Sequence, residues 1–275
     1  MAGSGKAHLR PAGEVLVQVE DLVVEFPAAK NRTVKAVSGI SLDVKAGETL
    51  GLVGESGCGK STVARSLIQL PPPKSGSVVV NGVELTDLSE QELRPHRTQL
   101  QMIFQDPISS LNPRRRVADI IAEPLRVWGP HDENEQAEIV DRMLYAVGLD
   151  PEVARDKRPH QFSGGQCQRI SIARSLVLGP KVLICDEPVS ALDVSVQAQI
   201  LNLLRDLKAE YGLTLVFIAH DLAVVKNVSD RVAVMYLGKL CEVAEPDKLF
   251  SNAAHPYTAL LLESIPEPDP AVVID

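Results

Sequence analysis

The sequence contains few cysteines, and their spacing argues against a structural metal site or a disulfide framework. Its 275 residues include 4 cysteines, and no two of them form a C-x-x-C pair. They are Cys58, Cys167, Cys185 and Cys241. Zinc sites and disulfide scaffolds need paired or clustered cysteines. The widely spaced cysteines therefore fit a protein of a reducing cytoplasm.

Long apolar runs and a basic surplus are also missing. No apolar run approaches the roughly 18 residues that a membrane-spanning helix needs. The first residues lack the apolar core of a signal peptide. The formal net charge is −8, whereas nucleic-acid-binding proteins usually carry a basic surplus. We therefore expect a globular protein with no nucleic-acid partner, built as one large domain or two closely joined subdomains.

What the sequence does contain is a phosphate-binding loop. Residues 54–61 match the pattern G-x-x-x-x-G-K-S, between an apolar run (49–53) and a helix-like run (62–68). Glycines let backbone N–H groups turn around a phosphate, and the helix N-terminus points at the same place. Lys60 can reach the β- and γ-phosphates of a nucleotide, and Ser61 can ligate Mg²⁺. The predicted nucleotide-binding residues here are Gly54, Glu55, Ser56, Gly57, Cys58, Gly59, Lys60, Ser61 and Thr62.

A phosphoryl-transfer site also needs an acidic residue at the end of a buried strand. The run Val-Leu-Ile-Cys-Asp at 182–186 supplies one, followed at once by Glu187. Asp186 is predicted to bind the metal, and Glu187 to orient and deprotonate an attacking water. A buried strand that merely ends in an acidic turn is the alternative, but the phosphate loop upstream favours the functional interpretation.

Periodicity predicts the order of the elements along the chain. Residues 15–44 indicate antiparallel strands with one wet face, and the Asn-Gly at 81–82 indicates a hairpin. Helical periodicity dominates from about 112 to 148, within a predicted helical insertion over about 107–178. Strands and helices alternate again from 182. We expect a disordered lead-in (1–12), a single nucleotide-binding domain (13–265) and a loose tail (266–275).

Four further motifs give the chain a specific resemblance. The segment Ser-Gly-Gly-Gln at 163–166 looks like the signature motif of ATP-binding cassette (ABC) ATPases. Gln105 stands where that family has its Q-loop glutamine. Residues 190–193 resemble the family's D-loop, which ends at Asp193, and His220 resembles its switch histidine. With the two phosphate-site motifs, these elements follow the family order over roughly residues 15–245.

The resemblance implies a fold and a set of roles. The fold is an α/β P-loop NTPase core with an antiparallel β subdomain and an inserted helical subdomain. Ser61, Gln105 and Asp186 would surround Mg²⁺, Glu187 would act as general base, and His220 would contact the γ-phosphate. Phe26, at the end of an early strand, would stack on adenine; a core or surface phenylalanine is its alternative. The implied ligands are ATP and Mg²⁺.

In that family two nucleotide modules face each other head to tail, and each ATP lies between the phosphate loop of one and the signature of the other. A serine hydroxyl and glycine amides at a helix N-terminus form a second anion site here too. Its predicted members are Ser163, Gly164, Gly165 and Gln166. The chain is thus expected to pair with a second ABC ATPase subunit, either a different chain or a copy of itself.

Several stretches are similar to the oligopeptide and dipeptide importer branch. They include Gln-Asp-Pro at 105–107, Pro-His-Gln-Phe at 159–162 and His-Pro-Tyr-Thr at 255–258. This resemblance implies a peripheral subunit on the cytoplasmic face of the membrane. It would be held by two membrane permease subunits and served by an extracytoplasmic substrate-binding protein. The branch often carries a cysteine-containing C-terminal extension; because no cysteine follows Cys241, we expect no iron–sulfur cluster.

Alternatives remain open at this stage. The basic run Arg114-Arg115-Arg116 is either a solvated loop or a contact with a membrane subunit or anionic lipid. The cargo could be a peptide, nickel or glutathione. The whole protein could instead be a non-transport cassette ATPase in phosphonate breakdown, DNA repair or translation.

Overall fold

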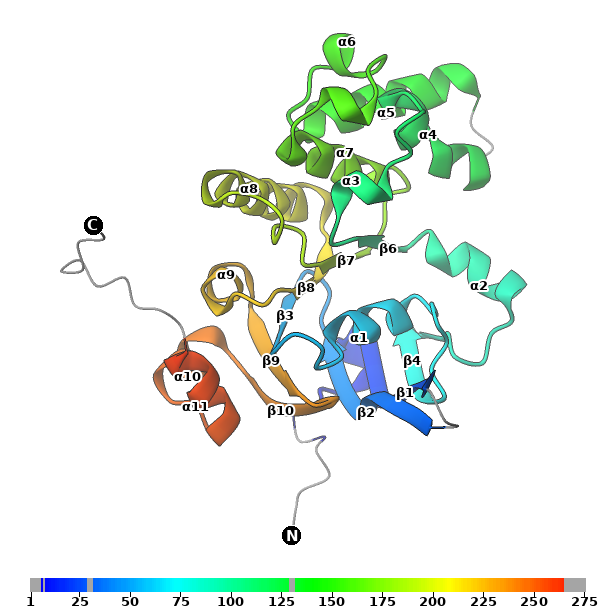
Figure 1. Cartoon of the computed structure of the whole chain (residues 1–275). Helices are drawn as coiled ribbons and strands as arrows, with labels where there is room; N and C mark the ends of the chain where they lie inside the picture. Colours follow the sequence, from blue (N-terminus) through cyan, green and yellow to red (C-terminus); the bar gives the residue numbers. More distant parts are fainter. Residues whose placement is uncertain (1–5, 7, 29–31, 129–131, 265–275) are drawn as a thin grey trace, which may run out of the picture.

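The computed structural model describes residue 6 and residues 8–28, 32–128 and 132–264. The predicted tail at 266–275 lies outside these residues. Two sheets, an intervening helix and a separate group of helices make up the described part of the molecule (Figure 1). None of the described helices is long and apolar enough to cross a lipid bilayer.

The first sheet is antiparallel, in the order β2-β1-β4-β5. Its strands are β1 (Val17–Ala28), β2 (Arg32–Val44), β4 (Ser75–Val80) and β5 (Val83–Glu84), preceded by the 3₁₀ turn η1 (Ala12–Glu14). The two extended runs predicted before residue 27 form one strand, because a register shift between Val19 and Leu22 absorbs their phase difference. The predicted Asn81-Gly82 turn is confirmed, and both residues adopt the positive φ angles that such a hairpin requires.

The second sheet has the order β10-β9-β3-β8-β7-β6. Neighbouring strands run parallel from β9 to β6, and β10 is antiparallel to β9. The strands are β3 (Thr49–Val53), β6 (Leu100–Ile103), β7 (Val182–Asp186), β8 (Thr214–Ile218), β9 (Arg231–Tyr236) and β10 (Lys239–Ala244). Strands β3, β7 and β8 are buried along their whole length, as continuous apolar runs predict for a sheet covered on both faces.

Helices cover both faces of this second sheet. Val63 and Leu67 of α1 (Lys60–Leu67) pack between the two sheets, against Leu50 and Ile184 of the parallel sheet and the antiparallel sheet on the other side. The opposite face, which includes Phe217, meets the helices that follow β7. These are α8 (Val194–Tyr211), α9 (Leu222–Val228), α10 (Pro246–Ser251) and α11 (Pro256–Glu263).

The predicted helical segment forms a group that stands apart from the antiparallel sheet (Figure 1). It consists of α3 (Pro107–Ser110), α4 (Val117–Trp128), α5 (Glu133–Ala146), α6 (Pro151–Ala154), the 3₁₀ turn η2 (Pro159–Gln161) and α7 (Gly164–Leu176); α2 (Glu90–Arg97) lies between β5 and β6. Helix α7 begins earlier than the predicted Cys167, because Ser163 and Gln166 form a capping box. The arrangement of sheets and helices confirms the predicted fold class.

The described part of the predicted disordered lead-in is held against the first sheet. Arg10 pairs with Asp43 and Glu48, and Lys6 pairs with Asp21. Asp43 has no exposed surface and Glu48 is 8% exposed, so each carboxylate needs a cation as a partner. Arg231 pairs with the same two acids. The structure therefore differs from the expectation at these residues, since sequence patterns did not reveal the buried acids that Arg10 and Arg231 neutralise together.

The contrast between two phenylalanines tests this description of the core. Phe217 is 1% exposed at the centre of the sheet, whereas Phe26 is 39% exposed. Phe217→Ala is expected to lower the free energy of unfolding by about 3–5 kcal/mol, because it removes buried area and leaves a cavity. Phe26→Ala should lower it by less than about 1 kcal/mol. Equal losses for both variants in denaturant unfolding would contradict this assignment.

Candidate active site

The sheet order brings four distant segments to one edge. Strands β3, β8, β7 and β6 are consecutive neighbours and run parallel, so their carboxyl ends meet at the same edge. The phosphate loop follows β3, and His220 follows β8. Asp186 ends β7, and Gln105 follows β6. Ligand sites in open α/β sheets form at such an edge.

The phosphate loop is fixed by close backbone approach. A Cβ atom on Gly54 would lie 2.2 Å from the carbonyl oxygen of Met235, and one on Gly59 would lie 2.3 Å from that of Ala36. Both glycines also have positive φ angles, 148° and 106°. A side chain at either position would clash with these carbonyl oxygens and displace the loop, so sterics require glycine at both positions.

Lys60 is buried inside this loop, with 4% of its surface exposed. Its Nζ donates to the carbonyl oxygens of Gly54 (2.7 Å) and Glu55 (2.9 Å). The ammonium group therefore lies within the curve of the loop, where a phosphate would be held. Helix α1 starts at Lys60, two residues before the predicted start, and its first turn adds backbone N–H groups to the same site.

The remaining predicted loop residues differ in their solvent exposure. Glu55, Ser56 and Gly57 form an exposed crest, while Cys58 is buried beneath it. Burial raises the pKa of the Cys58 thiol, and the nearby Lys60 only partly opposes this shift. Thr62 lies in the first turn of α1, where its carbonyl accepts a hydrogen bond from Ser66.

The predicted metal-binding side chains Ser61 and Asp186 are brought together. Ser61 Oγ donates to Asp186 Oδ1 at 2.8 Å, although the residues are 125 positions apart. Asp186 is 1% exposed; burial raises the pKa of its carboxyl group, and the hydrogen bond from Ser61 opposes that shift. A hydroxyl and a carboxylate beside a phosphate cradle are oxygen donors of the kind that Mg²⁺ prefers, so these residues fit the ion. Among the described residues, no cluster of three His, Cys, Asp or Glu could hold a metal by itself.

Glu187 lies beside this pair and faces two other predicted residues. Gln105 Nε2 donates to Glu187 Oε2 at 2.8 Å, and His220 Nδ1 lies 3.9 Å from the same oxygen. Glu187 has a φ angle of 49°, which is rare outside glycine, and its backbone N–H donates to Ile218 O at 3.0 Å. That bond to β8 holds the strained turn in place. Glu187 and His220 also line a cavity of about 60 Å³.

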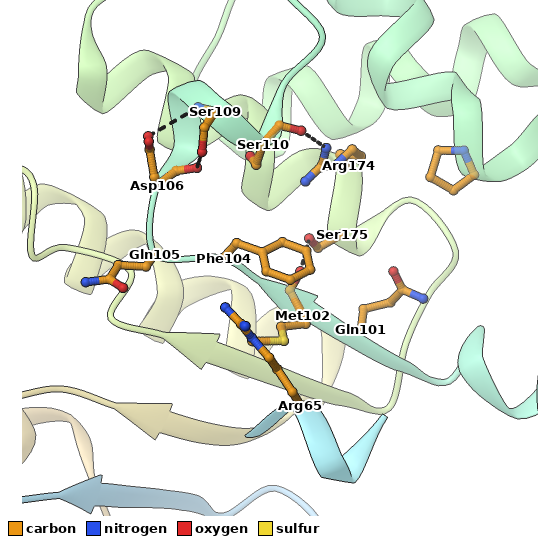
Figure 2. Close-up of a pocket in the computed structure, with 11 residues that line it drawn as sticks. Arg65, Gln101, Met102, Phe104, Gln105, Asp106, Ser109, Ser110, Arg174 and Ser175 are labelled. Atoms are coloured by element: carbon orange, nitrogen blue, oxygen red, sulfur yellow. Dashed lines mark hydrogen bonds between the residues drawn. The ribbon is translucent and has the colours of Figure 1, made fainter. Parts of the chain in front are cut away.

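The role of Gln105 as a metal ligand stays a prediction, and its side chain makes a different contact in the structure. Within the described part of the chain, no hydrogen bond joins it to Ser61 or Asp186. Its side chain instead holds Glu187, and it also borders a larger cavity of about 510 Å³ below α3 and α4 (Figure 2). Arg65 and Arg174 lie on opposite sides of this cavity, and Arg174 donates to Ser110 O at 2.7 Å. Burial lowers the pKa of Arg174. No sequence motif marked Arg65 or Arg174.

The signature residues cap α7 and pack on the start of α8. Gln166 N–H donates to Ser163 Oγ at 3.3 Å, and Ser163 N–H donates to Gln166 Oε1 at 3.0 Å. A Cβ on Gly165 would lie 2.5 Å from Val196, and one on Gly164 would lie 3.5 Å from Leu192. Among the described residues, no hydrogen bond or ion pair connects this segment with the phosphate loop of the same chain.

Asp193 and Phe26 stand at the margins of the site. Asp193 is the N-cap of α8; its carboxylate accepts from Val196 N–H (3.1 Å) and Ser195 Oγ (2.8 Å), and the Ser195 hydroxyl lowers its pKa most. Phe26 lies near the end of β1, opposite Val34 of β2. Strand β2 reaches the loop through Ala36, so Phe26 belongs to the strand pair that contacts the loop.

The basic run at 114–116 is largely engaged within the chain. Arg115 pairs with Glu123, and Arg116 pairs with Asp156. These ion pairs favour the interpretation of the run as a solvated loop that closes on its own helical group.

Comparison with known proteins agrees with this geometry. A family model described as "ABC transporter" matches residues 37–190, and one described as "Oligopeptide/dipeptide transporter, C-terminal region" matches residues 241–273. The oligopeptide transport ATP-binding protein OppF of Escherichia coli is 52% identical over 94% of this chain and 79% of its own length. The putative oligopeptide transport ATP-binding protein YkfD of Bacillus subtilis is 53% identical over 93% of this chain and 78% of its own.

Solved structures give the same answer at the level of the fold. The dimeric ATP-binding cassette MJ0796, bound to ADP and Pi, superposes with a TM-score of 0.76 and 27% identity over 84% of this chain and 98% of that one. CbiO1 of Clostridium perfringens, part of the ABC transporter complex cbiONQ, superposes with a TM-score of 0.76 and 30% identity over 87% of this chain and 92% of that one. The chain therefore belongs to the ABC transporter family, as one of its ATP-binding and ATP-hydrolysing subunits.

Proposed function

We propose that this protein hydrolyses ATP to power an importer for oligopeptides or dipeptides. The observation that carries the catalytic part is the convergence of Lys60, the Ser61–Asp186 pair and the Gln105–Glu187 pair at one sheet edge. The peptide part is supported by relatives near 50% identity that are named as oligopeptide transport proteins. GsiA of Salmonella paratyphi A, named for glutathione import, is 49% identical, so glutathione is the main alternative cargo.

The phosphate loop binds the nucleotide through its own backbone and Lys60. In the structure, Lys60 Nζ is satisfied by the carbonyls of Gly54 and Glu55. Phosphate oxygens are stronger partners for an ammonium group, because such hydrogen bonds are charge-assisted on both sides. Lys60 therefore turns towards the β- and γ-phosphates when ATP enters. The N–H groups at the start of α1 receive the same phosphates.

Ser61 and Asp186 would hold Mg²⁺, and Gln105, which follows the strand next to β7, would be the third side chain to face the ion. The ion, when bound, neutralises charge that builds up on the phosphate oxygens. The Ser61 hydroxyl, which donates to Asp186, would then turn its lone pairs outward. Because Asp186 is buried, little water screens its carboxylate, and its attraction to a bound cation is stronger.

Glu187 holds the catalytic carboxylate in one place. Its turn is fixed by the bond to Ile218 O, and its side chain is oriented by Gln105. We assign it the role of accepting a proton from the attacking water. His220, with 61% of its side chain exposed, is placed to reach the γ-phosphate from β8. Gln105 contacts Glu187 and also borders the cavity of about 510 Å³, so it would connect the position of the general base with whatever occupies that cavity.

The signature segment serves the nucleotide of a second subunit. Its residues make a capped helix N-terminus with exposed polar groups, yet within the described part of the chain no hydrogen bond joins them to the phosphate loop. A head-to-tail pair would place each signature over the other subunit's loop. Asp193, beside the signature, would lie at the same interface. The dimeric cassette MJ0796, bound to ADP and Pi and similar in fold, supports pairing of two such chains.

We place the protein on the cytoplasmic face of the membrane, held there by two permease subunits. The cavity beside Gln105 is our proposed contact for a permease segment, because its walls come from both the sheet and the helical group. A segment seated there would press on Gln105 and thus on Glu187. An extracytoplasmic binding protein would supply the peptide. This assignment leaves no role for nucleic acid.

Glu187→Gln tests the assignment of the general base. The amide cannot accept the proton, so the rate of ATP hydrolysis is expected to fall by about 10²- to 10⁴-fold, with ATP binding retained. Steady-state hydrolysis and equilibrium binding of ATP measure the two effects separately. Glu152→Gln, an exposed change on α6, is the matched control and should leave hydrolysis unchanged. Near-normal turnover of Glu187→Gln would exclude this role.

Mixing two inactive variants tests the composite site. Lys60→Ala disables the loop, and Ser163→Arg blocks the signature at an exposed position. A mixed pair has one site in which both halves are intact, so an equal mixture should recover up to about a quarter of wild-type hydrolysis if chains pair at random. Each variant alone should be inactive. A mixture that stays inactive, although both variants are folded and associate, would contradict the head-to-tail site.

Capture of the intact complex tests the transport role and its cargo. Glu187→Gln should retain two multispanning membrane proteins when purified gently in detergent with ATP, because hydrolysis no longer releases the closed pair. Mass spectrometry of the associated binding protein should find short peptides. Recovery without any membrane protein would favour an accessory or soluble cassette function. Glutathione or nickel as the bound ligand would replace the peptide assignment only.

A further inference from the structure

The C-terminal helix α11 makes a direct hydrogen bond to the phosphate loop. The backbone N–H of Glu55 donates to Tyr257 Oη at 3.2 Å, across 202 positions of sequence. Tyr257 lies in the first turn of α11, which packs beside β10 at one margin of the parallel sheet (Figure 1). The sequence marked this residue only as part of a family stretch. The structure places it against the loop that holds the phosphates.

Neighbouring residues hold both the ring and the backbone of Tyr257 in place. Its ring stacks on that of Tyr236, with 4.3 Å between ring centroids. Tyr236 directly follows Met235, whose carbonyl oxygen packs closely against Gly54. The backbone N–H of Tyr257 donates to His255 Nδ1 at 3.1 Å. Tyr257 is therefore held by the same strand end that supports the base of the loop.

Glu242 of β10 fixes the start of α11. Its carboxylate accepts from the backbone N–H groups of Ala254 (2.9 Å) and His255 (3.0 Å), each with a different oxygen. Burial works against ionisation of this carboxylate, but the two amides, together with Thr258 and the His255 side chain, outweigh it and lower the pKa of Glu242. The ionised side chain thus joins β10 to the residues that precede Tyr257. A continuous set of contacts runs from β10 through α11 to the loop.

Both the N–H group and the carbonyl group of Glu55 make hydrogen bonds, and ATP would affect the two differently. Its carbonyl accepts from Lys60 Nζ (2.9 Å) and from Cys58 N–H (3.2 Å). When Lys60 turns towards phosphate, that carbonyl loses its charged partner. The bond from Glu55 N–H to Tyr257 uses a different atom from the carbonyl oxygen that Lys60 leaves, so it does not depend on the Lys60 contact. Tyr257 can hold the exposed crest while Lys60 changes partners.

We propose that Tyr257 is a positioning residue for the phosphate loop and that, through it, the segment from β10 to α11 sets the affinity for ATP. This inference rests on the proposed role of residues 54–61 in binding ATP. The hydroxyl keeps the loop in the shape that binds phosphate, so less ordering is needed when the nucleotide enters. A change in α11 would then reach the nucleotide without touching it.

Tyr257→Phe is the direct test, because it removes one oxygen atom and keeps the ring on Tyr236. Loss of one hydrogen bond should weaken ATP binding and raise the KM for ATP by about threefold to tenfold, with kcat unchanged. Tyr236→Phe removes the hydroxyl of the stacked neighbour and is the matched control. It should bind ATP like the wild type. Isothermal titration and steady-state kinetics give the two quantities, and thermal unfolding should show equal Tm values for all three proteins.

A double-mutant cycle tests the route from β10. Glu242→Gln removes one of the two acceptors that fix α11, so it should raise the KM for ATP in the wild-type background. In the Tyr257→Phe background it should have little further effect, because the link to the loop is already gone. Additive effects of the two changes would overturn the proposed route.

These experiments also distinguish failure of this inference from failure of the proposed function. If wild type binds ATP and Tyr257→Phe binds it equally well, Tyr257 does not position the loop. A lower Tm with a parallel fall in kcat for Tyr257→Phe would likewise overturn the inference, because it would show a general structural role. If wild type itself binds no ATP, the proposed function fails first.

Discussion

The hydrogen bond between Ser61 and Asp186 is the contact on which the site depends. One residue lies in the first turn of α1, after the phosphate loop, and the other ends a buried strand, 125 positions away. A carboxylate at this depth requires a polar partner. The order β3-β8-β7 supplies it, since only β8 separates the two strand ends. Each further catalytic group follows from this alignment, because β8 and β6 deliver His220 and Gln105 to the same edge.

Much of this arrangement could be predicted from the sequence, for identifiable reasons. The loop at 54–61 and the acids at 186–187 belong to short motifs whose spacing reflects phosphate geometry. Fully apolar runs marked β3, β7 and β8 as strands buried on both faces. Resemblance supplied what periodicity could not, namely Gln105 and His220 as members of the site; it did not predict the hydrogen bond from Gln105 to Glu187. These local and family signals were sufficient for the fold class and the catalytic edge.

Other features were beyond the sequence because they depend on pairs that only the fold creates. Arg10 appeared to be part of a loose lead-in, since nothing in its neighbourhood announces the buried Asp43 and Glu48. The bond of Tyr257 to the loop joins segments 202 positions apart and has no motif of its own. Arg174 lies in α7, a mostly buried helix in which no motif marks it. In each case the physical partner is distant, so no local pattern records the contact.

The packing of the signature on α8 has a consequence for a pair of such subunits. Gly165 has no room for even one methyl group against Val196, and the segment from Glu187 to Asp193 leads directly into that helix; within it, Ser190 Oγ donates to Glu187 O at 3.1 Å. In the proposed pair, Glu187 acts on the subunit's own nucleotide, whereas the signature clasps the neighbour's. In such a pair the two ATP sites would be mechanically coupled, because a shift of the turn at one reaction centre would move the signature that contacts the other nucleotide.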